Sequence, residues 1–269
     1  MNNQKYPWAN KDLGQHFLIN DEVILNICTN FHSEAKGIIE IGPGPGILTE
    51  HLAKISCPYA VIEKDLRFEP YLEKWISQDQ VIWGDALETD LLQLIETKNF
   101  PKDHLWMVSN LPYNISIPLI LKFTDIPQIK YMTLMMQKEV AERILSEGKK
   151  ASKSMNSLMA LTQTFFDIQK RCHVAPTSFL PPPKVNSSVL SFVRKEEPAF
   201  PLSEIPLMEK FFKKLFIQRR KQMGKVLKLH FSQVVVNEVL EKRNIDPKRR
   251  AETLTLQEVQ ALYSSFSEN

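Results

Sequence analysis

The residues best equipped for chemistry are Asn110, Leu111, Pro112 and Tyr113, which follow the apolar run Leu105–Val108 after one serine. The run predicts a buried strand, so the four residues lie in the turn at its carboxyl end, where open α/β sheets bind ligands. The Asn110 side-chain carbonyl and the Leu111 backbone carbonyl could accept both N–H groups of adenine N6. Pro112 would fix the turn and Tyr113 could stack on the base. We therefore predict a pocket for an adenine that is flipped out or already unstacked.

Adenine N6 is a poor nucleophile because its lone pair is delocalised into the ring. Two carbonyl acceptors would favour a tetrahedral nitrogen whose lone pair points at an incoming methyl group, so no strong base is needed. Positioning could then supply on the order of 7–11 kcal/mol. Taken alone, the motif would more often be an ordinary turn with a core tyrosine, and the residues upstream decide between the two.

The glycine-rich segment Glu40–Gly46 follows a predicted strand and opens a predicted helix. Its spacing is G-x-G-x-G, whereas a dinucleotide pyrophosphate is seated by G-x-G-x-x-G. With an acid two residues before the first glycine, the segment resembles the donor loop of class I S-adenosylmethionine methyltransferases. Gly42 and Gly44 would let the backbone approach a ligand closely. A purely structural tight turn is the alternative.

Acids end the next two predicted strands. Glu63, which lies 21 residues after Gly42, could accept hydrogen bonds from both ribose hydroxyls of a nucleoside. Asp85 could accept from the adenine amino group of the methyl donor. Either acid could be an ordinary exposed residue, but three successive strand ends with suitable groups favour a donor site.

A proline-stiffened segment, Ser178–Val185, carries two further candidates. Phe179 could stack on the second face of the target base, and Lys184 could contact a phosphate. A core phenylalanine is the alternative for Phe179.

The elements that must position these residues are strand-like runs alternating with helical stretches, a pattern that predicts βαβ units and a mostly parallel sheet. The expected strands are Gly37–Ile41, Ala60–Glu63, Gln80–Trp83, Leu105–Ser109, Met132–Met136, Lys170–Val174 and Ser188–Val193. The expected helices are 21–33, Leu48–Lys54, Glu69–Ser77, Leu87–Thr97, Ile117–Phe123 and Lys138–Ser146.

From Pro201 onward the periodicity is only helical. We therefore predict an α/β catalytic domain over residues 1–197 and a small all-α domain over residues 198–269. The stretch Lys210–Lys228 has eight basic residues and no acid. It is either a solvated helical face or a phosphate-binding patch, and its densest part is Arg219, Arg220 and Lys221.

Composition narrows the class of protein. A length of 269 residues with 43% hydrophobic content suits one α/β domain and a smaller second one. No apolar run approaches the ~20 residues of a membrane span, and Met1–Trp8 has no apolar signal core. Cys28, Cys57 and Cys172 are isolated, so neither disulfides nor zinc are supported. We expect a soluble, cytoplasmic monomer with neither a metal nor a membrane partner.

Together these residues closely resemble the ribosomal RNA adenine dimethyltransferases, specifically those acting on the small-subunit RNA, over nearly the whole chain. The matching segments are Lys11–Leu18, Glu40–Gly46, Asn110–Ser116, Gln137–Arg143, Phe179–Val185, Gln218–Lys221 and Arg250–Leu254.

The resemblance implies a class I methyltransferase domain, Rossmann-like with a mostly parallel sheet, and a helical RNA-binding domain. It also implies transfer of two methyl groups from S-adenosyl-L-methionine to N6 of each of two adjacent adenosines. These adenosines lie in the 3′-terminal hairpin of small-subunit (16S) rRNA and are modified late in subunit assembly. The residues that it assigns to donor contacts are His16, Leu18, Gly42, Glu63, Asp85 and Asn110.

The chain departs from the family pattern at two places. The His16 position is held by Asn or His in such enzymes, and a lone histidine is more often structural. Ser154–Ser157 replaces a Tyr-Gly pair that is common after the Lys-rich loop Lys149–Lys153. The second departure puts RNA contacts or loop shape in doubt there and leaves the chemistry untouched.

Two other functions compete with this one. Erythromycin-resistance methyltransferases modify a large-subunit adenine with a similar fold, but Leu111, the Phe179–Val185 loop and Arg250–Leu254 favour the small subunit. A ribosome-assembly or transcription factor that binds RNA without catalysis would show erosion of the donor or acceptor motif, and both motifs are intact.

Overall fold

The computed structural model describes residues 9–10, 14–145 and 155–267. Several residues named above lie outside these ranges: Met1–Trp8, Lys11–Leu13, Ser146, Lys149–Lys153 and Ser154. The chain divides into two compact units. We call Met1–Ala141 with Ile168–Arg194 the sheet unit, and Glu142–Asp167 with Lys195–Asn269 the helical unit.

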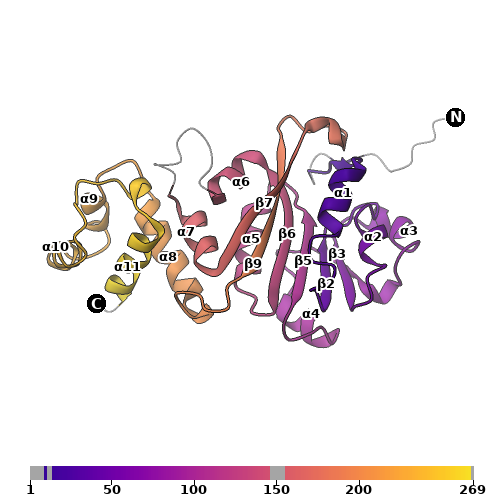
Figure 1. Ribbon diagram of the computed structural model, residues 1–269, viewed down its shortest axis with the longest axis horizontal. Helices are drawn as coiled ribbons and strands as arrows, with labels where there is room; N and C mark the ends of the chain where they lie inside the picture. Colours follow the sequence, from indigo (N-terminus) through magenta and orange to yellow (C-terminus); the bar gives the residue numbers. More distant parts are fainter. Residues whose placement is uncertain (1–8, 11–13, 146–154, 268–269) are drawn as a thin grey trace. The chain divides into compact units, whose positions relative to one another are not determined.

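The sheet unit is built on seven strands in the order β4-β3-β2-β5-β6-β9-β7 (Figure 1). They are β2 (Gly37–Ile41), β3 (Tyr59–Glu63), β4 (Val81–Trp83), β5 (Leu105–Asn110), β6 (Ile129–Gln137), β7 (Phe166–Val174) and β9 (Ser187–Arg194). The pairs β4–β3, β3–β2, β2–β5 and β5–β6 are parallel, and β9 pairs antiparallel with β6. The predicted fold class, a mostly parallel α/β sheet with a helical C-terminal part, is confirmed.

Burial on both faces explains the apolar composition of the central strands. Every residue of β2 is buried, and Trp106, Met107 and Val108 of β5 have no exposed surface. A parallel strand that is covered on both faces needs apolar side chains at every position rather than at alternate ones. The short continuous apolar runs of the sequence are the result.

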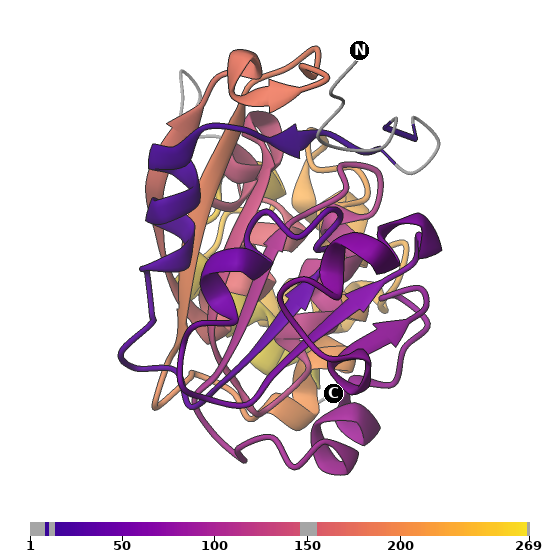
Figure 2. The same ribbon diagram turned by 90° about the vertical axis from the view of Figure 1, so that its right-hand side faces the viewer.

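Six helices accompany the sheet in sequence. They are α1 (Asp21–Cys28), α2 (Thr49–Leu52), α3 (Glu69–Leu72), α4 (Leu91–Thr97), α5 (Ser116–Thr124) and α6 (Lys138–Leu145). Helix α1 begins at Asn20, whose side chain accepts the Val23 N–H at 3.2 Å. Figure 2 shows this indigo helix beside the orange strands β7 and β9, whose Val174 and Val189 belong to the same core cluster as Val23.

The direction of winding reverses between β2 and β5. The chain leaves β2 outward through β3 and β4 and then returns to β5 on the other side of β2. Ile41 lies abreast of Ser109, and Ser109 Oγ donates to Ile41 O at 2.7 Å. Gly42, which follows β2, and Asn110, which ends β5, therefore lie at the carboxyl ends of two neighbouring strands at the switch point, where open α/β sheets leave a crevice for a ligand.

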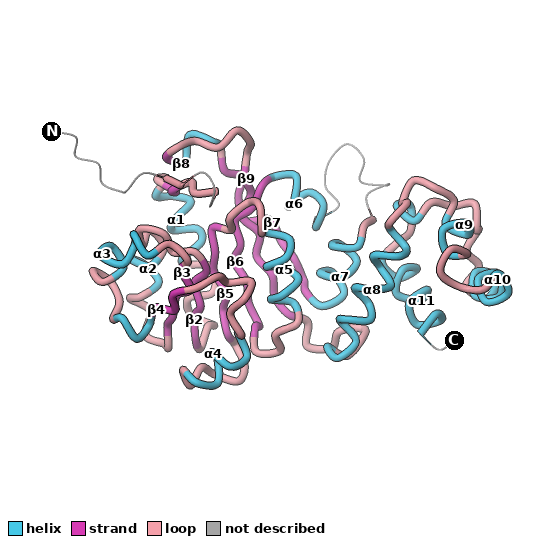
Figure 3. The backbone as a smooth tube through the Cα atoms, turned by 180° about the vertical axis from the view of Figure 1, so that it is seen from behind, coloured by secondary structure: helices cyan, strands magenta, loops and turns pink. Residues whose placement is uncertain are grey.

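A two-stranded ribbon lies beyond the carboxyl ends of these strands (Figure 3). Its strands are β1 (Phe17–Leu18) and β8 (Phe179–Leu180), which run antiparallel and pair Leu18 with Phe179. The ribbon brings the N-terminal segment and the proline-rich segment together, although they are far apart in sequence.

The helical unit has its own core. Its helices are α7 (Ser157–Phe165), α8 (Ile205–Phe216), α9 (Met223–Leu227), α10 (Gln233–Lys242) and α11 (Leu256–Ser267). Phe211 lies near the rings of Phe231, Tyr263 and Phe266, with centroid separations of 6.2, 5.7 and 5.7 Å. This aromatic cluster joins α8 and α11 to the segment after α9.

The two units are not separated by a single cut. The sequence predicts one boundary after residue 197, whereas the helical unit also takes in Glu142–Asp167. The reason is helix packing: Gln260 of α11 donates to Thr164 Oγ1 of α7 at 3.0 Å, and Lys195 Nζ donates to Gln163 O at 2.7 Å. The functional division between residues 1–197 and 198–269 stays a prediction.

Candidate active site

A cavity of about 240 Å³ opens at the carboxyl ends of the strands in the sheet unit. At roughly 10–15 Å³ per enclosed water, it has room for a nucleoside-sized ligand rather than for one ion or solvent molecule. Ten of the predicted site residues line it: His16, Leu18, Gly42, Gly44, Glu63, Asp85, Asn110, Leu111, Pro112 and Tyr113. Segments spread over almost a hundred residues of sequence thus meet at one site.

The glycine loop forms one wall through its backbone. Gly42 and Gly44 have φ values of +64° and +56°, which residues other than glycine rarely adopt. A Cβ added at Gly42 would meet no atom within 4 Å. Because Gly42 lines the cavity, its missing side chain leaves that space open to a ligand.

Glu63 fixes this loop by hydrogen bonds. One of its carboxylate oxygens accepts the Gly44 N–H at 2.9 Å, and the other accepts the Asp65 N–H at 2.8 Å. Burial raises the pKa of Glu63, and these backbone donors oppose the rise. Each carboxylate oxygen has a second lone pair, so both can still accept from a ribose hydroxyl.

Asp85 is held on two sides as well. Its Oδ1 accepts the Leu87 N–H, and its Oδ2 accepts from the Lys64 ammonium, both at 2.8 Å. The hydrogen bond from Lys64 lowers the pKa of Asp85, and the Leu87 N–H adds to this effect. An ionised carboxylate fixed in this way at the cavity wall is suited to accept from an amino group of a base.

The Asn110 amide has a defined orientation. Its Nδ2 donates to the His16 backbone carbonyl at 3.0 Å. Since a carbonyl can only accept, the amide nitrogen must face His16, which leaves Oδ1 as the acceptor of the side chain. The Leu111 N–H donates to Met135 O at 3.0 Å and fixes the start of the turn to β6.

Tyr113 has one face covered. The His16 ring stacks on it with centroids 5.7 Å apart and planes inclined by 27°. His16 Nδ1 lies 2.8 Å from Pro181 O, and Tyr113 Oη lies 2.6 Å from Ser187 Oγ. A base that stacks on Tyr113 must therefore use its other face or displace His16.

Phe179 does not reach the cavity. It is 2% exposed and packs with Phe17 and Leu18 in the core. Pairing of β8 with β1 turns its side chain inward, so its ring offers no open face to a base. The alternative of a core phenylalanine fits this arrangement. Lys184, in the turn between β8 and β9, is exposed.

Glu40 is a cavity residue for which the sequence predicts no role beyond its place before Gly42. It lines the cavity, is 1% exposed, and accepts hydrogen bonds from Thr49 Oγ1 at 2.8 Å and from the Tyr59 hydroxyl. Burial raises the pKa of Glu40 to about 7, against the effect of these two donors. The signal was visible: an acid inside an otherwise apolar strand needs a partner.

The N-terminal segment is fastened to β3 by a polar cluster that sequence reasoning missed. Gln15 Nε2 donates to Asp65 Oδ2 at 2.8 Å, and Arg67 forms an ion pair with the same carboxylate at 2.5 Å. Hydrogen bonding from Arg67 lowers the pKa of Asp65. Gln15 and His16 line the cavity. This cluster therefore fixes the segment whose His16 carbonyl accepts the hydrogen bond from Asn110.

The basic candidates of the helical unit are a separate surface. Arg219, Arg220 and Lys221 lie in the turn between α8 and α9, and all three are exposed. Nearby, the Lys214 ammonium lies 5.4 Å from the centre of the Phe231 ring. The arrangement suits contact with phosphates, which need exposed cations.

The cavity suits a nucleoside. It offers two carboxylates, a glycine backbone without side chains and apolar side chains such as Ile62 and Leu111. Among the described residues, no group of three His, Cys, Asp or Glu side chains could hold a metal ion, and no helix is long and apolar enough to cross a membrane.

Comparison with known proteins gives the same picture. The model of the family described as ribosomal RNA adenine dimethylase matches residues 8–267. The ribosomal RNA small subunit methyltransferase A of Staphylococcus epidermidis is 35% identical over 96% of this chain and 91% of its own. That of Staphylococcus aureus is 36% identical over 94% and 88%.

Two solved structures are similar over the length of the chain. A dimethyladenosine transferase from Plasmodium falciparum aligns with a TM-score of 0.73 at 25% identity, covering 94% of this chain and 98% of that one. The 23S rRNA methyltransferase ErmE aligns with a TM-score of 0.69 at 20% identity, covering 93% and 99%. The second likeness concerns the fold alone.

Proposed function

The chain belongs to the ribosomal RNA adenine dimethylase family, and from this premise we propose how its cavity works. The protein is an rRNA adenine dimethyltransferase. It transfers methyl groups from S-adenosyl-L-methionine to N6 of two adjacent adenosines in the 3′-terminal hairpin of small-subunit rRNA, during late assembly of the subunit. The observation that carries the proposal is that two sets of residues meet in one cavity: the donor wall, formed by Gly42, Gly44, Glu63 and Asp85, and the acceptor turn, which starts at Asn110.

The donor wall holds the nucleoside of the methyl donor. Glu63 accepts from the ribose hydroxyls, Asp85 accepts from the adenine amino group, and the backbone at Gly42 and Gly44 permits close approach. When bound, the donor supplies an electrophilic methyl group on a sulfonium. His16 and Leu18 close the cavity from the N-terminal side.

The acceptor turn holds the target amino group. Asn110 Oδ1 and the Leu111 carbonyl accept its two N–H groups, so the nitrogen lone pair is directed toward the donor methyl group. Fixing Asn110 through His16 O removes the need to reorganise the amide during reaction. Neither carbonyl is a strong base, so the proton that N6 loses passes to water.

Base stacking involves Tyr113 directly. Stacking by Phe179 remains a prediction, and it requires the ring to leave its position in the core. Lys184, Arg219, Arg220 and Lys221 are proposed as phosphate contacts, which position RNA without reading its sequence. The partner is thus small-subunit rRNA or the immature small subunit, bound by a monomer without metal.

The large-subunit alternative rests only on a shared fold, since ErmE is 20% identical, whereas relatives named for the small subunit are 35–36% identical. The test is incubation of the protein with labelled methyl donor and undermethylated small subunits, large subunits or naked RNA. Dimethyladenosine at two adjacent positions of small-subunit RNA is expected. Label found only in large-subunit RNA would refute the proposed target.

A further inference from the structure

A lysine that does not line the cavity forms hydrogen bonds to the loop that follows Asp85 of the donor wall. Lys122 of α5 donates to the backbone carbonyls of Ala86, Leu87 and Thr89 at 2.9, 2.7 and 2.5 Å. All three carbonyls belong to the segment directly after Asp85. The ammonium therefore makes three hydrogen bonds to one short loop.

The loop is folded around Asp85. The Asp85 backbone carbonyl accepts the N–H groups of Glu88 and Thr89 at 3.0 and 2.9 Å, and the Thr89 hydroxyl at 2.9 Å. The Asp85 side chain accepts the Leu87 N–H. The three carbonyls belong to this folded loop, so their position determines where the Asp85 carboxylate lies. Asp85 and Ala86 line the cavity, so the loop also shapes the cavity wall.

The same helix begins at the acceptor turn. Ile115 is the residue before α5, and Asn114 and Ile115 line the cavity. Lys122 follows Ile115 by two helical turns, a rise of roughly 10 Å along a rigid element. Figure 3 shows α5 as one continuous helix beside the sheet. The acceptor turn and the donor loop are thus attached to the two ends of α5.

The environment of the ammonium is unusual for a helical lysine. Partial burial lowers the pKa of Lys122, while the charges of Asp90 and Asp85 oppose that shift. Lys130 provides a contrast within the sheet unit: its ammonium donates at 2.8 Å to the carbonyl of Arg194 on β9, away from the cavity-lining residues. Because three carbonyls accept hydrogen bonds from one ammonium, Lys122 fixes the conformation of the loop that carries them.

We propose that Lys122 is a positioning residue for the methyl donor, which sets the Asp85 loop for the donor adenine and ties it to the helix that carries the acceptor turn. This inference rests on the proposed function, since it assumes that Asp85 faces the adenine amino group. Lys122 acts through the loop and touches neither substrate.

The test measures binding of two probes, S-adenosyl-L-homocysteine and S-inosyl-L-homocysteine, by calorimetry. The second probe replaces the adenine amino group with a carbonyl, which the Asp85 carboxylate should reject. We expect Lys122→Met to weaken binding of the adenosyl probe about 10-fold. The displaced Asp85 carboxylate would lose its hydrogen bond from the adenine amino group, and a hydrogen bond to a charged group is worth about this factor. The preference for the adenosyl over the inosyl probe should fall by a similar factor.

Matched variants separate positioning from folding. Lys130→Met removes a lysine–carbonyl bond elsewhere in the sheet unit and should leave both affinities unchanged. Lys122→Arg keeps the charge and several donors, and should restore the preference to within about 3-fold of the original protein. In steady-state methylation, Lys122→Met should raise KM for the donor by more than it lowers kcat.

Each outcome decides the matter. If Lys122→Met folds and its probe preference equals that of Lys130→Met, the inference is wrong. If Lys122→Met does not fold, Lys122→Gln, which keeps two N–H donors, replaces it, and an unchanged preference there has the same meaning. If the unsubstituted protein binds neither probe, the proposed function itself fails, which is a different result from an unchanged preference.

Discussion

The cavity of the sheet unit and the basic turn of the helical unit hold their polar groups in opposite ways. In the cavity, Glu63 is 6% exposed and accepts two backbone N–H groups, and the Asn110 amide is oriented by the His16 carbonyl. In the turn between α8 and α9, Arg219, Arg220 and Lys221 are exposed. Orientation is built into the first region, whereas the second offers charge without a fixed geometry.

The difference teaches which physical variable controls each region. Buried groups lose hydration, so their protonation and alignment carry large free energies. Exposed cations act through Coulomb forces that salt screens within about 10 Å at 0.1 M. Geometry and pH should therefore govern the cavity, and ionic strength should govern the basic turn.

The largest effect should come from Asn110→Ala, because it removes an acceptor that is already aligned. We expect kcat for methyl transfer to fall on the order of 100- to 1,000-fold, as when one aligned group of a transition-state site is removed. Calorimetry with S-adenosyl-L-homocysteine should show a much smaller change in affinity. Labelled-donor assays with undermethylated small subunits measure the first quantity.

Asn237→Ala is the matched control, since Asn237 is exposed on α10 and does not line the cavity. Its kcat should stay within about 3-fold of the original value. Near-normal activity of Asn110→Ala would contradict the proposed handling of N6 and would remove the contrast between an oriented and an unoriented region.

The second effect concerns stability and sharpens the role of burial. The folded-state pKa of Glu40 is about 7, above its ordinary value of 4.5. The folded chain therefore binds more protons than the unfolded chain between these values. The stabilisation from protonated Glu40 is complete below pH 4.5 and is lost as pH rises through about 7, a change of about 3 kcal/mol.

Glu40→Gln should lack this dependence, because its amide does not titrate. The difference in unfolding free energy between the original protein and the variant should therefore shift in favour of the variant as pH rises from 4.5 to above 7. Urea titrations at several pH values measure it. Glu69→Gln, at an exposed carboxylate on α3, should follow the profile of the original protein. Parallel profiles for Glu40→Gln would mean that Glu40 is not protonated in the fold.

The sequence predicted the cavity better than the surfaces around it. Strand ends such as those at Gly42, Glu63 and Asp85 could be read because buried parallel strands leave short apolar runs, and polar residues after such runs must meet at one edge. The residues predicted to hold the donor therefore line one cavity. The burial of Phe179 could not be predicted, because Phe179 lies in a strand of two residues that pairs with Phe17–Leu18, and no local pattern records a pairing across that distance.

Two further features left no readable signal. Lys122 is one of many helical lysines, and only the fold shows that its ammonium meets three carbonyls. The segment Glu142–Asp167 joins the helical unit through contacts with residues near 195 and 260, so a boundary sought along the chain could not be found there. Predictions from periodicity reach local elements, and they stop where long-range packing decides.

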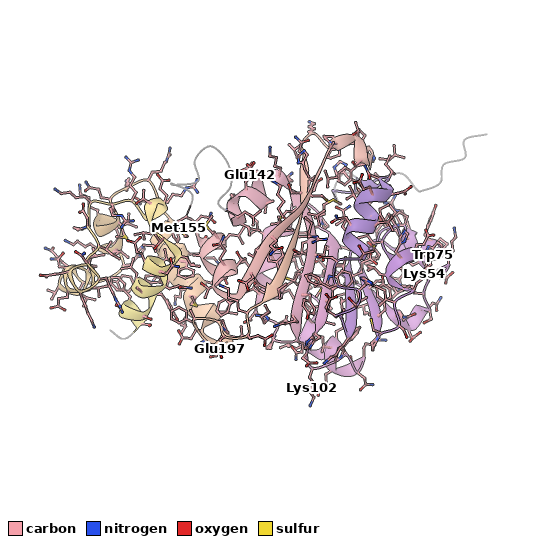
Figure 4. The ribbon with its side chains drawn as sticks, in the orientation of Figure 1. Lys54, Trp75, Lys102, Glu142, Met155 and Glu197 are labelled. Carbon is pink, nitrogen blue, oxygen red and sulfur yellow. The ribbon has the colours of Figure 1, made fainter. Side chains whose placement is uncertain are left out.

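The smallest effect should come from the basic turn, and it is distinguished by its dependence on salt. Replacing Arg219, Arg220 and Lys221 together by alanine should weaken RNA binding roughly 10-fold at physiological ionic strength, since exposed phosphate contacts are individually modest. If all three contact phosphates, the slope of log affinity against log salt concentration should flatten by about 2 to 3, because each contact releases close to one counterion. The control triple is Lys36, Lys98 and Lys102, which are exposed and precede β2 and β5 at the amino ends of the strands. Figure 4 marks Lys102 at that edge of the sheet unit. Both triple variants remove the same charge. A flatter slope for the first triple alone would place the phosphate contacts at the basic turn, whereas the same slope for both triples would mean that the basic turn is only solvated.

Affinity for S-adenosyl-L-homocysteine should not change in either triple variant, because the cavity depends on the alignment of its own groups and not on the net charge of the chain.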